Sequence, residues 1–513
     1  MLTNGHFEHP QMHLYPYQQE AIAWMEQRER CKTVRGGFLC HEMGLGKTVM
    51  TTTLFKRRLV RRTLILTPKS TLLGWLDTLR TVGDFAFNVY EFRKGLVLPT
   101  DRPLVVVATH QSVLRNREWF VAERFQRILV DEAHVLRNLG GKVAQTVLAL
   151  ARDIPIRWGV TATPYNNKDS DMNAYMAFLF PTHAIDARPP TTVFKHLMLR
   201  KLRAEVFPTG PKLLIRKHIY EFEHPEEQEM YDFVAQRIDQ QAQWLAANRN
   251  HLPHHVVGAM IILQMLRERQ ATIHPQIVLN AEKVWRNAWN HALGVGANVE
   301  VPEWDKTRVT KINHVLKMVK ADQAAHKSTL VITHFKDEIA LIAERLETAK
   351  VPYKVLNGKT GKVERRRIET HEGGMNRTYT DAFVNKWSLQ KINRPIPEDI
   401  MRTILTFTHR PTVVLMQIQA GGVGLSLPWI HHVINMSPDW NPFLERQAIF
   451  RAYRLTTKHD VRVTQMFLQD TIDRTIHTKQ MQKLARSLFW TGDDESTIHD
   501  FAAPEMIDAA EDD

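Results

Sequence analysis

The sequence predicts an α/β protein with two lobes, each built on a doubly wound parallel sheet, and a helical insert between them. Short apolar runs alternate with helical patterns through residues 1–223 and again through 301–485. Such alternation places helices on both faces of a parallel sheet. Residues 224–300 instead begin with Glu, Gln, Ala and Met at helical spacing, and strand signals disappear. We expect an insertion at about 370–403 and a disordered acidic tail at 486–513.

A glycine-rich turn follows the first apolar run, Gly37 to Cys40, and leads into a predicted helix near Val49. Strand, glycine-rich turn and helix form the setting that a phosphate-binding loop requires. Glycines let backbone N–H groups converge on a phosphate, a lysine can reach the β- and γ-phosphates of ATP, and a hydroxyl can bind Mg²⁺. The pattern GxxxxGK[ST] requires Gly where His41 stands, so an ordinary turn ending in Lys-Thr is the alternative. The predicted ATP-binding residues of the loop are Met43, Gly44, Leu45, Gly46, Lys47 and Thr48, with Thr48 as a metal ligand.

A pair of carboxylates ends another apolar run. Residues 127–130 are followed by Asp131-Glu132-Ala133-His134. A carboxylate at the end of a buried strand is where a P-loop ATPase places its Mg²⁺ ligand. Asp131 would therefore hold the metal, and Glu132 would orient or deprotonate the attacking water. An exposed acidic turn is the alternative, but the nucleotide loop upstream favours a hydrolysis site.

The composition limits the class of protein and its partners. A chain of 513 residues is long enough for two or three domains, and its net charge of +13 favours a polyanionic partner such as nucleic acid. No apolar run approaches the roughly 20 residues of a membrane helix, and the longest, Val256 to Leu266, predicts a buried helix. We therefore expect no membrane association. Cys31 and Cys40 are the only cysteines, so we also expect no disulfides and no zinc site.

These motifs, with Arg137 and Asn138 after the second, resemble the Swi/Snf family of DNA-translocating ATPases in helicase superfamily two, in its DEAH-box form. That family begins its loop with Asp, and only His41 differs. The resemblance implies RecA-like lobes that use ATP and Mg²⁺, and it implies that Gln18 contacts adenine. It also implies DNA-contacting or coupling roles for loop residues of the first lobe, namely Thr67, Pro68, Thr109, Thr161 and Thr163.

The second lobe contains the most informative long stretch, Gln419 to Arg454. A glycine-rich loop is followed by Trp440-Asn441-Pro442 and then by a predicted helix with Arg451 and Arg454. Their spacing of three places both arginines on one helical face. This order resembles the fifth and sixth Swi/Snf motifs, which implies that both arginines act catalytically on the γ-phosphate. The implied DNA-contacting or coupling residues here are Gly421, Gly422, Gly424 and Gln447.

Other positions extend or limit the resemblance. The segment Leu266 to Gln270, followed by His274-Pro275, resembles a family signature in the helical insert. Phe450 stands where the family has Gly, and Tyr453 where it has His. Neither position carries catalytic charge, so we expect hydrolysis to be retained, whereas the efficiency of coupling to DNA is open.

The resemblance implies an ATP-dependent translocase on double-stranded DNA that remodels nucleosomes or other protein–DNA complexes, with transcription machinery among its partners. The nucleus, or a cytoplasmic site of viral or bacterial DNA metabolism, is the expected location. A strand-separating DNA or RNA helicase, an inactive binding module and a restriction-type translocase subunit are the alternatives. The compactness of the chain also resembles the global transactivators of large insect DNA viruses, which implies a viral transcription regulator with the same ATPase core.

Overall fold

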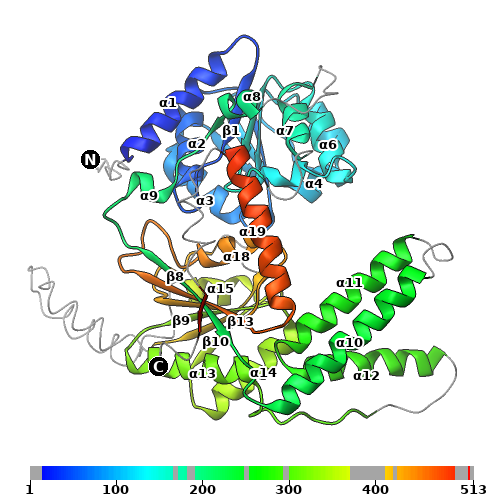
Figure 1. Cartoon of the computed structure of the whole chain (residues 1–513). Helices are drawn as coiled ribbons and strands as arrows, with labels where there is room; N and C mark the ends of the chain where they lie inside the picture. Colours follow the sequence, from blue (N-terminus) through cyan, green and yellow to red (C-terminus); the bar gives the residue numbers. More distant parts are fainter. Residues whose placement is uncertain are drawn as a thin grey trace, which may run out of the picture. The chain divides into compact units, whose positions relative to one another are not determined.

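The computed structural model describes residues 14–165, 171–181, 191–247, 254–292, 300–369, 411–419, 425–491 and 506–508. The chain divides into two compact units. The first is Met1–Gly210 with Arg486–Asp494, and the second is Pro211–Ala485 with Glu495–Asp513. Each unit contains a parallel sheet of seven strands within the described ranges (Figure 1). The predicted fold class, two doubly wound α/β lobes, is confirmed.

The sheet of the first unit has the strand order β3-β4-β2-β5-β6-β1-β7, and all its pairs are parallel. Its strands are rich in Val, Leu and Ile and are buried on both faces, as strands covered by helices must be. They are β1 (Arg35–Leu39), β2 (Arg62–Thr67), β3 (Asn88–Glu91), β4 (Leu104–Thr109), β5 (Arg127–Asp131), β6 (Ile156–Val160) and β7 (Met198–Leu199).

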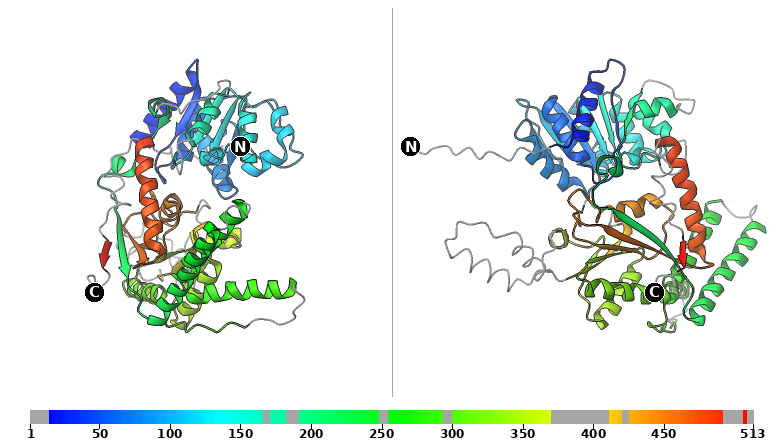
Figure 2. Two further views of the ribbon diagram at one scale, coloured as in Figure 1. Left: turned by 45° about the vertical axis from the view of Figure 1, so that its right-hand side comes forward. Right: turned by 60° about the vertical axis from the view of Figure 1, so that its left-hand side comes forward.

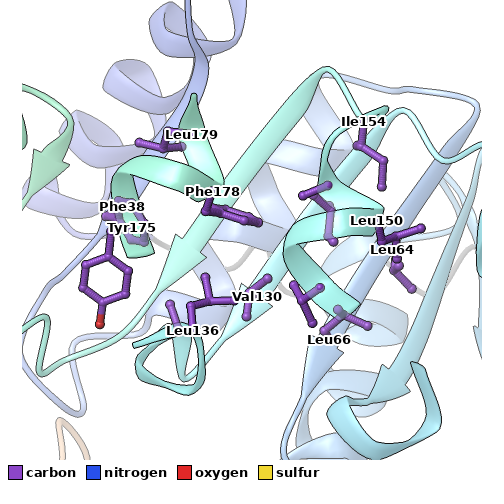
Figure 3. Close-up of a cluster of buried hydrophobic side chains, with 14 of the residues drawn as sticks. Phe38, Leu64, Leu66, Val130, Leu136, Leu150, Ile154, Tyr175, Phe178 and Leu179 are labelled. Carbon is purple, nitrogen blue, oxygen red and sulfur yellow. The ribbon is translucent and has the colours of Figure 1, made fainter. Parts of the chain in front are cut away.

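Helices cover both faces of this sheet, because alternate residues of each strand point to opposite sides. In β2, Leu64 and Leu66 join one core cluster (Figure 3), whereas Ile65 joins the other. Five helices contribute to the first cluster and three to the second. The first cluster receives α4 (His110–Arg115), α5 (Arg117–Ala122), α6 (Lys142–Ala151), α7 (Asp171–Leu179) and α8 (Thr191–His196), and the second receives α1 (Pro16–Arg30), α2 (Lys47–Arg57) and α3 (Leu72–Gly83). The 3₁₀ helix η1 (Ala133–Leu136) and α9 (Arg203–Val206) complete the unit.

The register of three strands determines where the loops that follow them begin. Val160 at the end of β6 pairs with Leu39 at the end of β1 and with Asp131 at the end of β5. The three loops therefore start at the same edge of the sheet. Ligands of open α/β sheets bind at this carboxyl edge.

The sheet of the second unit has the order β10-β11-β9-β12-β13-β8-β14, again with parallel pairs. Near their carboxyl ends, Asn435 of β12 pairs with Ile332 of β9, so the loops after these two strands are neighbours. The strands are β8 (Leu213–Tyr220), β9 (Thr329–Thr333), β10 (Tyr353–Leu356), β11 (Val413–Gln417), β12 (His432–Asn435), β13 (Val461–Leu468) and β14 (Met506–Asp508).

Three long helices fill the range of the expected insert and project from one side of the second unit, with α10 and α11 side by side (Figure 2). The apolar core on one face of the second sheet comes mainly from α13 and α14. Within the described residues, the helices of this unit are α10 (Pro225–Ala247), α11 (His254–Ala271), α12 (Pro275–Ala292), α13 (Thr310–Ala324), α14 (Lys336–Thr348), α15 (Lys362–Glu369), α18 (Pro442–Ile449) and α19 (Ile472–Thr491), of which the residues from Arg486 on belong to the first unit.

Three details differ from the sequence predictions. The first stretch of the first unit ends at Gly210 rather than at residue 223, because β8 pairs with β13 of the second sheet. The tail from 486 is not wholly disordered, since α19 continues to Thr491 and the apolar pair Met506-Ile507 lies in β14, paired with β8. The helix containing residues 256–266 forms, but it is not buried: Ile262 is 68% exposed and Leu263 is 46% exposed. Its apolar residues point in several directions, whereas α10 and α12 cover only part of its surface.

Within the described ranges, no helix is both long enough and apolar enough to cross a membrane. Cys31 and Cys40 are free thiols. The same ranges contain no cluster of three or more His, Cys, Asp or Glu side chains arranged to hold a metal ion.

Candidate active site

The glycine-rich turn between β1 and α2 has the backbone shape of an anion-binding loop. Gly44 and Gly46 adopt positive φ angles of 81° and 78°, a conformation that favours glycine. Gly46 is the N-cap of α2, whose first residue is Lys47. A Cβ on Gly46 would lie 2.6 Å from Nε2 of Gln18, so a larger residue there would displace the Gln18 amide. The positive end of α2 and the turn's N–H groups are suited to a phosphate.

The first helix packs its polar side chains against this turn. Tyr17 Oη donates a hydrogen bond to the Leu45 carbonyl at 3.0 Å, and Gln18 Nε2 lies 3.4 Å from the same oxygen. The Gln18 Oε1 accepts from the Tyr15 backbone N–H at 3.1 Å. Gln18, the residue implied to contact adenine, is thus fixed beside the loop, and Leu45 is buried beneath it. Met43 and Thr48 are half-buried.

Lys47 folds back over its own loop. Its Nζ donates to the carbonyls of His41, at 2.7 Å, and Glu42, at 3.0 Å. Burial lowers the pKa of Lys47 to about 8, while the charges of Glu132 and Asp131 act in the opposite direction. The structure therefore brings together the three residues that the sequence assigned to phosphate, metal and water. A lysine held by two carbonyls can exchange them for phosphate oxygens.

His41 occupies the position where the resemblance expects Asp. The residue is fully buried, and neither ring nitrogen has a hydrogen-bond partner among the described residues. Burial, with the nearby charges of Lys47 and Arg200, lowers the pKa of His41 to about 3. The imidazole is therefore neutral at physiological pH and adds no charge next to the loop.

Asp131 ends β5 and is held by three donors on one oxygen. Its Oδ2 accepts from Thr67 Oγ1 at 2.8 Å, from Trp75 Nε1 at 2.8 Å and from Thr71 Oγ1 at 3.3 Å. Burial raises the pKa of Asp131, and the neighbouring charge of Glu132 raises it further, whereas the bonds from Trp75 and Thr67 lower it. The carboxylate is thus fixed in direction by the segment that follows β2.

Glu132 has a left-handed backbone, with φ 49° and ψ 53°. Non-glycine residues in this region carry strain, and such residues occur often at functional sites. Its Oε2 lies 3.1 Å from Nδ1 of His134. His110 is within hydrogen-bonding distance of the Asp131 carbonyl, at 3.1 Å, and burial lowers the pKa of His110 to about 4, so it is neutral. His110 thus contacts the backbone of Asp131, and His134 lies beside the Glu132 carboxylate.

Two residues of this site, Thr71 and Trp75, were not predicted from the sequence. Thr71 follows Thr67 by four residues and Trp75 follows Thr71 by four, which places Thr71 and Trp75 on one face at the start of α3. That regular spacing after a strand was the available signal. It could not identify the partner, because Asp131 lies 56 residues from Trp75 in the sequence.

The residues implied to contact or couple DNA in the first unit differ in exposure. Thr67 is fully buried and Thr161 and Thr163 nearly so, and the Thr161 hydroxyl accepts from the Thr163 backbone N–H at 3.2 Å. Thr109 caps α4 by accepting from the Ser112 N–H at 3.1 Å. Pro68 is half-buried. Thr67, Thr161 and Thr163 are thus buried in this conformation, and their role toward DNA stays a prediction.

The two arginines of the second unit are not on a helix as predicted. The helix α18 ends at Ile449, and residues 450–453 form tighter turns in which the Arg451 N–H donates to the Ala448 carbonyl. Beyond the helix, the buried Tyr453 donates from its hydroxyl to the Pro211 carbonyl. Arg451 Nη1 and Arg454 Nη2 nevertheless both donate to the Leu425 carbonyl, at 3.3 and 3.1 Å.

Burial lowers the pKa of Arg454 to about 10, so the guanidinium stays charged at neutral pH. Gln447, on α18, is half-buried. The three predicted glycines of the preceding loop, Gly421, Gly422 and Gly424, lie outside the described residues. The second unit thus presents a pair of cations beside the residue that follows this loop.

Two family models match the sequence. Residues 17–277 match the SNF2-related domain, which is more than half of the chain. The chain belongs to the SNF2-related family. Residues 395–456 match the helicase conserved C-terminal domain. The predicted family is confirmed, and this SNF2-related chain is an ATP hydrolase of the helicase-like class.

Curated relatives of this SNF2-related chain include the "Probable global transactivator" of Orgyia pseudotsugata multicapsid polyhedrosis virus, 25% identical over 92% of this chain and 90% of the relative. Transcription termination factor 2 of Drosophila melanogaster is 24% identical and Protein CHROMATIN REMODELING 24 of Arabidopsis thaliana is 22% identical, each over 92% of this chain. The chain spans only 56% and 46% of the lengths of these two proteins.

Among solved structures, the Sulfolobus solfataricus SWI2/SNF2 ATPase core in complex with dsDNA is similar at 20% sequence identity. The match covers 95% of this chain and 96% of that one, with a TM-score of 0.37. Because this TM-score is low, the family assignment stands on the two family models.

Proposed function

We propose that this SNF2-related ATPase is a motor that translocates on double-stranded DNA and thereby remodels nucleosomes or other protein–DNA complexes. The observation that carries the proposal is the bond between Asp131 and the segment after β2. In a motor, the group that senses the nucleotide must be mechanically connected to the loops that hold the track. Thr67 and Thr71 provide that connection, because both donate to the Asp131 carboxylate.

The residues at the carboxyl edge of the first sheet fit ATP with Mg²⁺. The loop's N–H groups and Lys47 would bind the phosphates, and Thr48 with Asp131 would hold the metal ion. Bound Mg²⁺ neutralises phosphate charge during phosphoryl transfer. Glu132 would orient the attacking water and accept its proton, for which its fixed position after β5 is suited.

Arg451 and Arg454 are proposed to stabilise the charge that develops on the γ-phosphate. Both guanidinium groups converge on one carbonyl, that of Leu425, which offers far less charge than a phosphate. Exchange of that carbonyl for a phosphate oxygen would strengthen the interaction, because the phosphate oxygen carries negative charge and arginine can bind a phosphate through two parallel N–H bonds. Hydrolysis would release the arginines, and alternating engagement would move the motor along one strand of the duplex.

The partner is proposed to be duplex DNA bound through its phosphates. The net charge of +13 supports a polyanion, and loop hydroxyls and N–H groups position a protein on the backbone without specifying sequence. Affinity should then be independent of sequence, and its logarithm should fall with that of the salt concentration by about 0.9 per phosphate contact. A salt-independent affinity would count against this partner.

The decisive experiment separates a translocase from a strand-separating helicase. ATP hydrolysis is measured with duplex DNA, single strands and RNA, and two displacement assays follow. A translocase should be stimulated by duplex DNA and should displace the third strand of a triplex without unwinding a forked duplex. Unwinding of the fork without triplex displacement would assign the chain to the helicases instead.

A second candidate is transcriptional regulation during viral infection, with the same ATPase core. It is supported by the viral global transactivator, of which this chain spans 90%, in contrast to the partial spans of the two cellular relatives. The nucleus, or another site of DNA metabolism, is the corresponding location. A reporter assay comparing the wild-type chain with Lys47→Ala would test this role, because an ATP-driven activator should lose its effect in that variant.

A further inference from the structure

Arg269 is a buried cation near the end of α11, in the segment that resembles a family signature. Its side chain is 7% exposed, and its Nη1 lies 3.5 Å from Oδ2 of Asp439. Its Nε and Nη2 have no hydrogen-bond partner among the described residues. Burying a guanidinium with so few acceptors costs free energy, so packing alone does not explain the residue.

Asp439 is bound to the first turn of α18 in two ways. Its Oδ1 accepts from the Asn441 N–H at 2.8 Å, and Asn441 in turn caps α18 through the Phe443 N–H at 3.1 Å. Its own backbone N–H donates to Glu445 Oε1. Any force on the Asp439 carboxylate therefore acts on the start of α18.

The other charged groups near this carboxylate do not replace Arg269. Burial holds the pKa of His334 well below its usual value, so the ring at 3.5 Å from Asp439 Oδ2 is neutral. Lys311 is paired with Asp473 at 2.6 Å. The carboxylate of Glu338 accepts from the backbone N–H groups of residues 334 and 335. Lys483, whose charge also acts on Asp439, donates to the Trp440 carbonyl at 2.6 Å. Arg269 is therefore the cation in direct contact with the Asp439 carboxylate.

The far end of α18 leads directly to the two arginines. The helix is eight residues long, which corresponds to about 12 Å. A helix this short moves as one body, so a shift at Asp439 would pass to Arg451 and Arg454. Both arginines are held at the Leu425 carbonyl, so a small rotation of α18 changes where their guanidinium groups point.

We propose that Arg269 is a positioning residue, through which the helical insert sets the orientation of α18 and so of Arg451 and Arg454. In the hydrolysis-competent state, the guanidinium and Asp439 form a bidentate pair. The inference rests on the proposed function of the two arginines, and it adds a residue that touches neither nucleotide nor DNA.

The distance between Arg269 and Asp439 is short enough for a bidentate pair to form after a small movement of α11. A charge-assisted N–H···O bond is typically about 2.7–2.9 Å long, whereas the Arg269 to Asp439 distance is 3.5 Å. Moving α11 by less than about 1 Å would close this gap. It would also bring a second, presently unpartnered nitrogen to the carboxylate. The insert and α18 thus share a contact that can tighten without refolding.

The test uses the full chain with Arg269→Gln, Arg269→Lys and Asp439→Asn, and with Arg267→Gln as the matched control. Arg267 lies on the same helix, but its Nη1 bonds Gln270 at 2.6 Å. Turnover is measured with saturating duplex DNA, per nucleotide-binding site, together with KM for ATP. Arg269→Gln should lower kcat roughly 10- to 100-fold, since a misplacement of about 1 Å can cost about 100-fold. KM for ATP and the control should stay within about twofold of wild type.

Two combinations distinguish positioning from loss of stability. Arg269→Gln with Asp439→Asn should be no worse than the poorer single variant, and Arg269→Gln should add no loss in an Arg454→Ala background. Arg269→Lys keeps the charge and most of the volume, and it should show an intermediate kcat. Turnover like wild type in Arg269→Lys, or losses that multiply with Arg454→Ala, would overturn the inference. If duplex DNA fails to stimulate the wild-type chain, the proposed function fails, and the same combinations on unstimulated turnover still test Arg269.

Discussion

Two buried arginines, one in each unit, are held in opposite ways. Arg127 in the first unit donates to both Glu29 oxygens, at 2.8 and 2.7 Å, and also to the Arg58 carbonyl at 2.7 Å. Arg269 in the second unit has one acceptor, at 3.5 Å. The first lies at the amino end of its strand, and the second faces a loop at the carboxyl end of its sheet. Arg127 is thus part of the scaffold of the first unit, whereas Arg269 lies at the contact that is proposed to tighten during hydrolysis.

The same contrast exists within a single strand. β5 begins at Arg127 and ends at Asp131. A change at its amino end should reduce stability and leave the chemistry of folded molecules intact. A change at its carboxyl end should do the reverse. The two ends of one strand can therefore be tested against each other.

The largest effect is expected at the second unit's arginines, where stability should hardly change. Arg454→Ala should lower ATP turnover by roughly 10³- to 10⁵-fold while sparing ATP affinity, because an arginine finger acts on the transition state. Arg451→Ala should show a smaller loss. Steady-state kinetics and equilibrium binding of an ATP analogue measure the two quantities. Arg474, whose side chain is 77% exposed, offers a control substitution to Ala, and equal losses there would refute the assignment.

The next effects concern the nucleotide loop and the acidic pair. Glu132→Gln should lower turnover by roughly 10²- to 10⁴-fold through loss of the general base, with ATP still bound and DNA engaged. Lys47→Ala should also weaken ATP binding, since it removes a phosphate contact that is present before the reaction. Normal turnover in either variant would exclude this site.

At the scaffold end, Glu29→Gln should lower the unfolding free energy by about 3–5 kcal/mol, because it leaves Arg127 as an incompletely compensated buried charge. Turnover per folded molecule should stay near wild type. Denaturant unfolding, followed through the first transition of the full chain, measures the loss. A stable variant with reduced turnover would reverse the proposed division between scaffold and functional ends.

The buried carboxylate of Glu338 should make the unfolding free energy depend on pH. Burial raises the pKa of Glu338 to about 7 from 4.5, although its backbone donors act against burial. A pKa raised by folding adds stability that is complete below about 4.5 and disappears as the pH rises through about 7. The stability lost between these two pH values is about 3 kcal/mol. Glu338→Gln should remove this decline in unfolding free energy between about pH 4.5 and 7, because its carbonyl oxygen can keep the backbone bonds. The exposed Glu344 on the same helix gives the control, and an unchanged slope in Glu338→Gln would contradict the assignment.

The sequence was sufficient to predict those parts of the site whose residues are neighbours in the chain. The strand that ends at Asp131 and the turn before Lys47 were both found from local apolar runs and glycines, and the paired halves of the fold followed from their repetition. The predicted helix through Arg454 ends at Ile449, and Tyr453 beyond it bonds a carbonyl 242 residues away, a contact that local patterns do not indicate. For the same reason, the partners of Asp439 could not be predicted, since Arg269 lies 170 residues from it. Contacts between distant segments depend on strand order, which local patterns do not specify.

The smallest effect compares the same substitution at two tryptophans of the first unit. Trp75 Nε1 donates to Asp131 Oδ2 at 2.8 Å, and Trp158 Nε1 donates to Glu29 Oε1 at 3.0 Å. Both side chains are buried, so changing either to Phe removes one indole donor and a similar volume. A hydrogen bond to a charged group contributes about 1.5–3 kcal/mol, so both variants should lose stability to a similar extent.

Only Trp75→Phe should also change the chemistry, because its acceptor is the proposed Mg²⁺ ligand. With one donor gone, Asp131 is less firmly oriented, and turnover should fall by about 10-fold at limiting Mg²⁺. Excess Mg²⁺ should restore much of that loss, whereas Trp158→Phe should show the wild-type dependence on Mg²⁺. Turnover measured across a Mg²⁺ titration, beside thermal unfolding of each variant, separates the two effects. If both tryptophan variants shifted the Mg²⁺ requirement equally, the two ends of the sheet would not be independent, and the distinction between a paired scaffold and an adjustable site would fail.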